Sequence, residues 1–186
     1  MKFGVASTDD KAILRSSHDW REMLSLGLKE ESLNEFKNIV YELVNKKLPD
    51  APFHRDAFEV LQKLKEKSKR IAIFSTMDRS IFEPAIKYRN LHEVVEVAIA
   101  GTDVPYRKPH PAGILKALDD LKIPKKEFKT VVYMGDKDTD IQAAQNAGID
   151  SILYYPIEHE LMYSLEELKK HEPCYIISDW RELLEN

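Results

Sequence analysis

The sequence predicts an α/β fold with a mostly parallel sheet. Short runs rich in β-branched residues alternate with longer segments of helical period, which is typical of strands joined by crossover helices. The 186 residues suffice for one sizeable core, and 43% hydrophobic with 32% charged residues is an ordinary globular composition. We therefore expect one main domain with room for only a small insertion.

Six short apolar segments are the expected strands. They are residues 2–6, 71–74, 94–100, 130–134, 151–154 and 175–177. Residues 11–51, between the first two strands, carry no strand signal and predict a small helical insertion. Within it, Ser32 and Glu35 have the spacing of a capping box, and an earlier helix is expected around Leu24.

The later helices lead from one strand to the next. A helix capped by Ser80 is expected to hold Pro84 in its first turn, where a backbone N–H has no helical acceptor anyway. Ser164 with Glu167 repeats the capping-box spacing, and residues 180–184 predict a last short helix. The other apolar helix faces are Phe58, Leu61 and Leu64; Leu115, Leu118 and Leu121; and Ile141, Ala144 and Ala147, the last stopped by Gly148.

Charge, hydropathy and cysteine content exclude several kinds of partner. With a net charge of −4 and no basic block, we expect no nucleic-acid partner. No apolar run approaches the roughly 18 residues of a membrane helix, and the first residues lack a secretory signal pattern, which favours a cytoplasmic protein. The single cysteine, Cys174, has no CxxC partner for zinc and is expected in the core. The oligomeric state stays open.

Acidic residues directly follow the strand at 130–134, at the edge of an open α/β sheet where ligands bind. Gly135 lets the chain turn sharply, so that Asp136 and Asp140 can converge on one hard cation. We interpret Asp138 as the cap of the following helix. Three carboxylates within five positions repel one another unless something cationic lies among them, which favours a metal site.

Two further strand ends supply groups suited to a phosphate. Ser75 and Thr76 close one strand, and their hydroxyls could donate to phosphoryl oxygens, although such residues usually satisfy nearby backbone instead. Lys108 is followed by Pro109, which stiffens the backbone, so its ammonium is a directed point charge. His110, between two prolines, is a candidate substrate contact or a simple turn residue.

In this order the segments resemble motifs two, three and four of the haloacid dehalogenase-like (HAD) superfamily. The carrying residues are Ser75 at a strand end, Lys108 before a proline, and the Gly-Asp-x-x-x-Asp segment with Asp136 and Asp140. The Lys-Pro-His-Pro and Gly-Asp-x-x-x-Asp segments are similar to the phosphoglycolate-phosphatase type of that family. The resemblance covers nearly all of residues 52–186.

This resemblance implies a fold and an activity. The expected fold is a Rossmann-like three-layer core with a parallel sheet, formed by residues 1–10 and 52–186, and a small helical cap formed by residues 11–51. The implied activity is Mg²⁺-dependent phosphoryl transfer from a small phosphorylated substrate. In that reading Ser75, Thr76 and Lys108 hold the phosphoryl group, and Asp136 and Asp140 hold Mg²⁺.

The first motif of the family is the point of departure. The family has a nucleophilic aspartate at the end of strand one and an acid/base aspartate two residues later. With residues 2–6 as that strand, Ser7 takes the nucleophile position and Asp9 the acid/base position, whereas a register with Asp9 as nucleophile places Lys11 second. A phosphoserine is an ordinary ester that water cleaves less readily than an acyl phosphate, so Ser7 predicts impaired turnover.

Three alternatives stay open at this point. The separation of Ser7 from Ser75 is short for a cap of this type, so the first residues could belong to the cap, with strand one upstream. A catalytically silent protein that binds a phosphorylated ligand or a protein partner is the rival to the phosphatase. A response-regulator receiver is disfavoured, because there the lysine follows the phospho-accepting aspartate, whereas Lys108 precedes Asp136.

Overall fold

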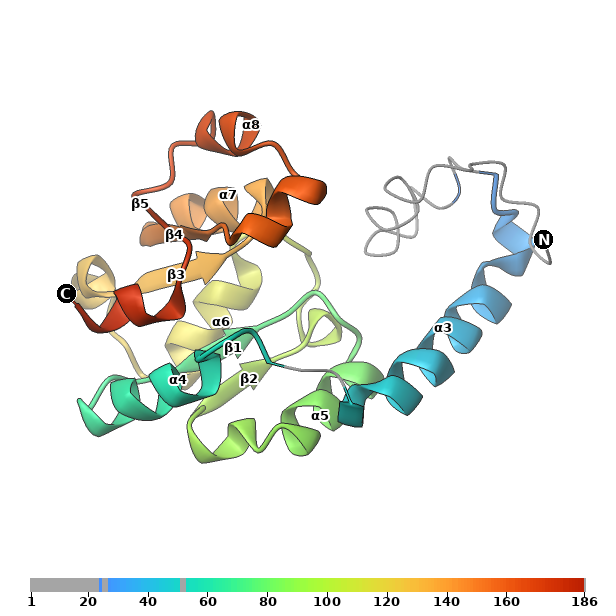
Figure 1. Ribbon diagram of the computed structural model, residues 1–186, viewed down its shortest axis with the longest axis horizontal. Coiled ribbons are helices and arrows are strands. Elements are labelled where there is room, and N and C mark those ends of the chain that lie inside the picture. The colour runs from blue at the N-terminus through green and yellow to red at the C-terminus, as the bar shows by residue number, and fades with distance from the viewer. Residues whose placement is uncertain (1–23, 25–26, 51–52, 186) are drawn as a thin grey trace. The chain divides into compact units, whose positions relative to one another are not determined.

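The computed structural model describes Leu24 and residues 27–50 and 53–185 (Figure 1). The chain divides into two compact units, Met1–Lys47 and Leu48–Asn186. The expected strand at residues 2–6, together with Ser7 and Asp9, lies outside the described residues. The roles predicted for these two residues stay predictions.

The described part of the first unit is helical. A 3₁₀ turn, Glu30–Ser32, leads into helix α3, Leu33–Lys47. The helix carries Glu35 in its first turn and two lysines in its last, which is the charge order that the helix dipole favours. The predicted helix is present, but Ser32 lies in the 3₁₀ turn that precedes it.

In the second unit strands and helices alternate, which confirms the α/β prediction. The elements in order are α4 (Ala57–Glu66), β1 (Ala72–Phe74), α5 (Arg79–Tyr88), β2 (Val97–Ile99), α6 (Ala112–Asp120), β3 (Val132–Gly135), α7 (Asp138–Ala147), β4 (Asp150–Tyr154), α8 (Leu165–Lys169) and β5 (Tyr175–Ile177). Short 3₁₀ turns connect several of them, including η3 (Leu91–Glu93), η6 (Ile157–Leu161) and η7 (Trp180–Leu184). Strand β2 is shorter than residues 94–100, the apolar run that predicted it.

All strand pairs among the described residues are parallel. β1 pairs with β2, and β3, β4 and β5 form a second sheet in that order. In the second sheet Met134 lies opposite Ile152, and Leu153 lies opposite Ile176. Because β1 and β2 are parallel, the loops after them emerge at the same edge (Figure 1). Side-chain contacts of Tyr133 with Phe74 O and of Lys108 with Asp140 bring the residues of β3 and the start of α7 beside them.

The sheet β3–β4–β5 is covered on both faces, as a three-layer core requires. On one face Leu153 packs with Ile141 of α7, and on the other Ile152 and Tyr154 pack with Trp180 of η7. Alanines on α7 complete the first layer; Ala143 and Ala144 are fully buried beside Phe74 and Ile99 of the other sheet. Full burial of one large aliphatic side chain contributes roughly 1.5–3 kcal/mol, so these layers stabilise the strand ends firmly.

Of three predicted helix boundaries, two are confirmed and one is shifted in the structure. Gly148 ends α7 with a φ of 77°, and Ser164 Oγ accepts a hydrogen bond from Glu167 N, both as predicted. The helix predicted to be capped by Ser80 begins two residues earlier, because the Asp78 carbonyl accepts hydrogen bonds from the N–H groups of both Ile81 and Phe82. Pro84 is therefore the sixth helical residue, beyond the first turn.

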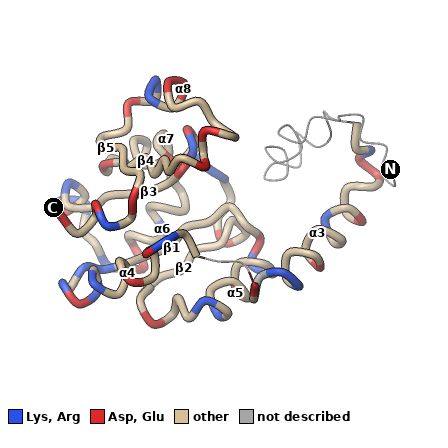
Figure 2. Tube along the Cα trace, in the orientation of Figure 1, with Lys and Arg blue, Asp and Glu red and all other residues tan. Residues whose placement is uncertain are grey.

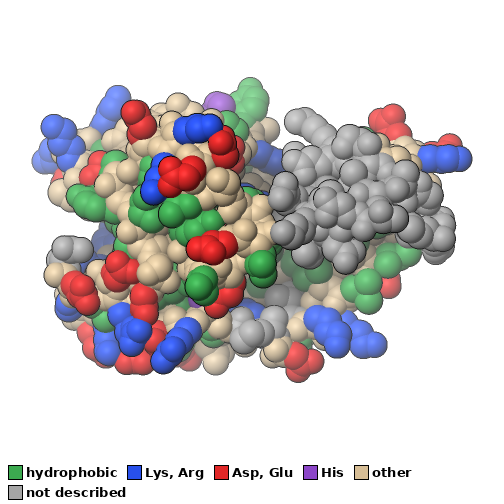
Figure 3. Space-filling view, turned by 45° about the horizontal axis from the view of Figure 1, so that its top comes forward, with side chains coloured by type: hydrophobic (Ala, Val, Ile, Leu, Met, Phe, Trp, Pro, Cys, Tyr) green, Lys and Arg blue, Asp and Glu red, His purple; other side chains and the backbone are tan. Residues whose placement is uncertain are grey.

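One further prediction, the burial of Cys174, was wrong. Cys174 is exposed rather than part of the core, since it lies just before the edge strand β5, where its Sγ accepts from Ser151 N at 3.5 Å. The last short helix is present at residues 180–184, as predicted, and it is a 3₁₀ helix. No helix in the described ranges is long and apolar enough to cross a membrane. Acidic and basic residues are interleaved along the chain (Figure 2) and over the face shown in Figure 3.

Candidate active site at the carboxyl ends of the strands

The described candidates lie in the loops and the first helical turn that follow the strands at one edge. Ser75 and Thr76 follow β1, Lys108 lies between β2 and α6, and Asp136 and Asp140 follow β3. The contacts of Lys108 bring these loops together. Its Nζ lies 2.5 Å from Asp140 Oδ1, and 5.2 Å from the centroid of the Phe74 ring, which directly precedes Ser75.

Lys108 and Asp140 form a buried ion pair. Their side chains are only 12% and 5% exposed, and Lys108 Nζ also donates to the Tyr133 hydroxyl at 3.0 Å. Burial by itself would lower the pKa of Lys108, but the adjacent Tyr133 and Asp140 oxygens more than offset it, and the pKa is raised above its ordinary value. Lys108 is therefore a firmly held cation at neutral pH.

Asp140 is held through both of its oxygens. Oδ1 accepts from Lys108, while Oδ2 accepts from the backbone N–H groups of Asp136 and Lys137, each at 3.1 Å. The carboxylate thus occupies the N-terminus of α7, where the helix dipole favours negative charge. The prediction that Asp138 caps this helix was wrong, because Asp138 is its first residue and Asp140 takes the free N–H groups instead.

Gly135 is required for space. A Cβ on Gly135 would lie 2.3 Å from both Cβ and Cγ of Asp140, far inside any real contact. The sequence predicted a glycine for a sharp turn, but only Gly27 and Gly148 have positive φ among the described glycines. The position requires glycine because the Asp140 side chain lies too close to the strand for a Cβ to fit.

The hydroxyl residues after β1 are bound locally. Ser75 N donates to Ile99 O at 3.0 Å, and Ser75 Oγ accepts from Met77 N at 3.2 Å. The Ser75 hydroxyl proton is still available to a ligand, because a hydroxyl can donate and accept at once. Thr76 is half-buried where the loops after β1 and β2 meet: a Cβ on Gly101 would lie 2.5 Å from the Thr76 carbonyl oxygen.

The acids of this loop fit Mg²⁺ in part. Mg²⁺ prefers oxygen ligands and is commonly held by one or two carboxylates together with water and substrate phosphate. Asp136 is half-buried and offers a carboxylate, whereas both oxygens of Asp140 already accept hydrogen bonds. Within the described ranges no three His, Cys, Asp or Glu side chains gather in a way that could hold a metal ion.

Two residues at this edge escaped the sequence reasoning. Tyr133, in β3, was interpreted only as a strand residue, although a hydroxyl within an otherwise apolar strand was an available signal. His159, in η6 after β4, was expected at the surface but is 6% exposed, and burial lowers its pKa. Its Nδ1 atom is buried without a hydrogen-bond partner in the described structure. His110 accepts from Ala112 N at 3.2 Å, which fits a turn residue.

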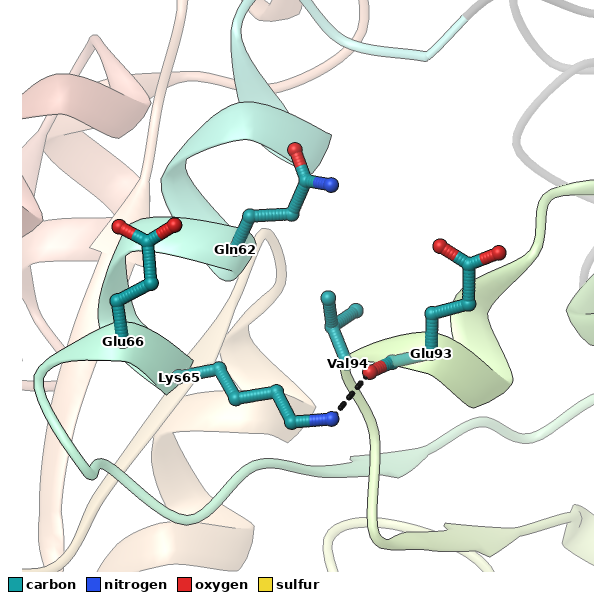
Figure 4. A pocket seen from close by; sticks show the side chains of 5 residues that line it. All are labelled: Gln62, Lys65, Glu66, Glu93 and Val94. Atoms are coloured by element: carbon teal, nitrogen blue, oxygen red, sulfur yellow. Dashed lines mark hydrogen bonds between the residues drawn. The ribbon is translucent and has the colours of Figure 1, made fainter.

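A cavity of about 390 Å³ lies away from these residues (Figure 4). It is lined by Gln62, Lys65 and Glu66 of α4 and by Glu93 and Val94, which precede β2. Lys65 Nζ donates to the Glu93 carbonyl across it (Figure 4). Because α4 leads into β1 and Val94 leads into β2, the cavity lies toward the amino ends of the strands, and it is not part of the candidate site.

Sequence comparison relates the chain to phosphate-cleaving proteins. The sequence profile of the haloacid dehalogenase-like hydrolases matches residues 2–154. A protein of Caldanaerobacter subterraneus subsp. tengcongensis, provisionally named pyrophosphatase PpaX, is 30% identical over 167 residues, which are 88% of this chain and 73% of that protein. The pyrophosphatase PpaX of Bacillus mycoides is 25% identical over 169 residues, or 91% of this chain and 74% of its own.

Solved structures share the fold. A provisionally named haloacid dehalogenase-like hydrolase of Bacteroides fragilis superposes with a TM-score of 0.79 at 25% identity, covering 97% of this chain and 85% of that one. A provisional phosphoglycolate phosphatase of Lactobacillus plantarum gives a TM-score of 0.78 at 18% identity, covering 95% and 82%. The Rossmann-like α/β architecture expected from the motifs is confirmed.

Proposed function

The chain belongs to the haloacid dehalogenase-like hydrolase family, and we propose that it is a Mg²⁺-dependent phosphatase acting on a small phosphorylated metabolite. The observation that carries the proposal is the buried Lys108–Asp140 pair at the strand edge that also bears Ser75 and Asp136. A cation fixed in this way, out of bulk water, stabilises the negative charge of a phosphoryl group more strongly than a mobile surface lysine would.

The phosphoryl group is held from two sides in this proposal. Lys108 supplies the positive charge, and the Ser75 hydroxyl donates a hydrogen bond from the end of β1, with Thr76 beside it. Ser75 and Lys108 lie in the same region, since Phe74, the residue before Ser75, has its ring centroid 5.2 Å from Lys108 Nζ. Arg107 takes no part, because it is directed to Asp78 at 3.4 Å.

Mg²⁺ belongs to the same proposal. Asp136 supplies a carboxylate ligand, and Asp140 supports it by holding the N–H groups of Asp136 and Lys137. When bound, the ion would neutralise charge on the phosphoryl oxygens. A direct bond from Asp140 to Mg²⁺, as the sequence suggested, would require that carboxylate to release one of its present partners.

Asp9 takes the general acid/base role in this proposal, and Ser7 limits the rate. Without an attacking carboxylate, no acyl phosphate forms, and turnover of phosphomonoesters is expected to be slow. Ser7→Asp should raise Mg²⁺-dependent hydrolysis of para-nitrophenyl phosphate by at least about tenfold, or roughly 1.4 kcal/mol in barrier. A folded but inert Ser7→Asp protein would exclude residues 2–6 as the first motif.

The central test is binding of a phosphate analogue. Lys108→Ala should weaken the binding of tungstate, measured by titration calorimetry, whereas the matched neighbour Arg107→Ala should leave it within about twofold, as expected for an exposed charge. Asp136→Asn should weaken Mg²⁺ binding in the same assay. Equal losses from Lys108→Ala and Arg107→Ala would contradict the site. Pyrophosphate and phosphoglycolate, which occur in the names of similar proteins, are the first substrates to assay.

A further inference from the structure

Tyr133 lies where the candidate elements meet. Its hydroxyl accepts from Lys108 Nζ at 3.0 Å and has two acceptors within reach of its own proton. These are the Phe74 carbonyl at 3.2 Å and Asp140 Oδ1 at 3.4 Å, of which Phe74 is the nearer. One side chain therefore contacts the lysine, the acid and the strand that ends at Ser75.

The backbone pattern of β1 explains why the Phe74 carbonyl is available. The residues on either side of β1 direct their hydrogen bonds to the β2 side: Ile71 O accepts from Glu96 N, and Ser75 N donates to Ile99 O. Because backbone groups alternate along a strand, those of Phe74 point to the opposite edge. Among the described strands nothing pairs with β1 at that edge, and Tyr133 OH reaches the Phe74 carbonyl there.

Tyr133 also limits where Lys108 can direct its charge. An ammonium group has three N–H donors; two are taken, by Asp140 Oδ1 and by the Tyr133 oxygen. With two donors fixed, the direction of the third follows from the tetrahedral nitrogen. A phenol is protonated at neutral pH, so the Tyr133 hydroxyl can accept from Lys108 Nζ and donate its own proton at the same time.

We propose that Tyr133 is a positioning residue, which ties the end of β1 to the Lys108–Asp140 pair and thereby directs the free N–H of Lys108 toward a phosphoryl group held at Ser75. The ligand part of this statement rests on the proposed phosphatase function. The geometric part, that the Tyr133 hydroxyl orders the Lys108 ammonium, stands on the three hydrogen-bond distances alone.

Tyr133→Phe tests the proposal, with Tyr155→Phe as its matched control. Tyr155 directly follows β4, is 7% exposed, and donates its hydroxyl to the Tyr163 carbonyl at 2.7 Å, but it has no contact with Lys108 among the described interactions. Both variants lose one buried phenol-to-carbonyl hydrogen bond, but Tyr133→Phe also loses the bond from Lys108 Nζ, so its unfolding midpoint in urea should fall further. Tungstate binding should weaken about tenfold in Tyr133→Phe only, while less than twofold loss in Tyr155→Phe is expected.

A double-mutant cycle separates positioning from general damage. If Tyr133 acts through Lys108, Tyr133→Phe should have no further effect on tungstate affinity once Lys108 has become alanine. Additive losses in Tyr133→Phe and Lys108→Ala would overturn the proposal. Should Tyr133→Phe fail to fold, Tyr133→Met, which also keeps an apolar body without a hydroxyl, takes its place in the cycle.

A ligand-free readout makes failure of the inference distinct from failure of the proposed function. The ¹⁵N ammonium signal of Lys108, assigned by its loss in Lys108→Ala, should show slow proton exchange in the native protein because the group is buried and hydrogen-bonded. Tyr133→Phe should speed this exchange at least about tenfold, and Tyr155→Phe should not. Unchanged exchange in Tyr133→Phe overturns the inference. Absent tungstate binding by the native protein would instead count against the phosphatase site alone.

Discussion

The ends of β3 and β1 both bear predicted site residues, but they are held in different ways. At the end of β3, Asp140 accepts from Lys108 and from two backbone N–H groups, and it is 4% exposed. At the end of β1, the one hydrogen bond that Ser75 Oγ accepts among the described residues comes from Met77 N, two residues along the chain. The β3 end is therefore part of the folded core, whereas the β1 end supplies a hydroxyl that can turn to a ligand. We therefore expect substitutions at the β3 end to lower mainly the stability of the fold, and substitutions at the β1 end to lower mainly the affinity for a ligand.

The largest expected effect comes from breaking the ion pair. Asp140→Asn keeps the shape of the side chain but leaves the Lys108 ammonium buried without a charged partner. Such removal of one member of a buried pair typically costs about 3–5 kcal/mol. Urea unfolding should show a loss of that order, while Asp120→Asn, which breaks the exposed Lys116–Asp120 pair, should cost less than about 0.5 kcal/mol. If both variants lose a similarly small amount of stability, the Lys108–Asp140 pair stabilises the fold no more than an exposed ion pair does.

Gly135→Ala tests the same end by steric means. The added Cβ would lie 2.3 Å from Asp140 Cβ, so Asp140 must move and its backbone contacts must break. We expect a loss of about 2–3 kcal/mol, in the upper part of the range for overpacking. Gly148→Ala is the control: it meets nothing within 4 Å, and only its φ of 77° opposes a side chain. That control should lose about 1–2 kcal/mol and keep the tungstate affinity that Gly135→Ala loses.

His159 gives the next effect, which depends on pH. Burial lowers the pKa of His159, so the unfolded chain takes up this proton more readily than the folded one. Stability from the neutral ring is present above about pH 6.5 and is lost as the pH falls through the lower folded pKa. The free energy of unfolding should drop between pH 7.5 and 5, and His159→Phe should flatten that drop. If the exposed His92→Gln flattens it equally, the dependence does not come from burial of His159.

Ser75→Ala should have the smallest effect on stability and so completes the contrast. It removes one local hydrogen bond to Met77 N, at 3.2 Å, and costs at most about 1 kcal/mol. If the hydroxyl serves a ligand, tungstate affinity should nonetheless fall severalfold in calorimetry. A large loss of stability with unchanged affinity would reverse the distinction between the two strand ends.

Local pattern was enough to predict most of the fold. β-branched runs marked the strands from β1 to β5, and the order of Ser75, Lys108 and the Gly-Asp-x-x-x-Asp segment led to the family that the comparisons confirm. Strand ends were less certain, since β2 is three residues long where the apolar run has seven. Backbone hydrogen bonds to a neighbouring strand decide which apolar residues form the strand. These bonds join residues that are far apart in the sequence, so a local pattern does not predict them.

The contacts of the site depended on the same long-range information. Tyr133 and Phe74 lie 59 residues apart in sequence, and no periodicity relates a phenol to a carbonyl at that separation. The role of Gly135 was missed for a related reason: its neighbour is a side chain on the next helix, not its own backbone conformation. Cys174 was expected in the core from its apolar neighbours Tyr175 and Ile176, but both of these neighbours are themselves exposed on the edge strand β5.

The alanine face of α7 makes the helix unequally tolerant of mutation. Ala143 and Ala144 have no exposed surface, and with Ala147 they let the helix lie directly against the strands and α6. Replacement by glycine or serine removes or adds little volume, whereas any branched residue has no space to enter without pushing the helix outward. Outward movement of α7 would carry Asp140 with it, since that carboxylate lies in the first turn of the same helix. Variation among natural or selected sequences should accordingly be narrow on this face, even though none of these alanines is a candidate site residue.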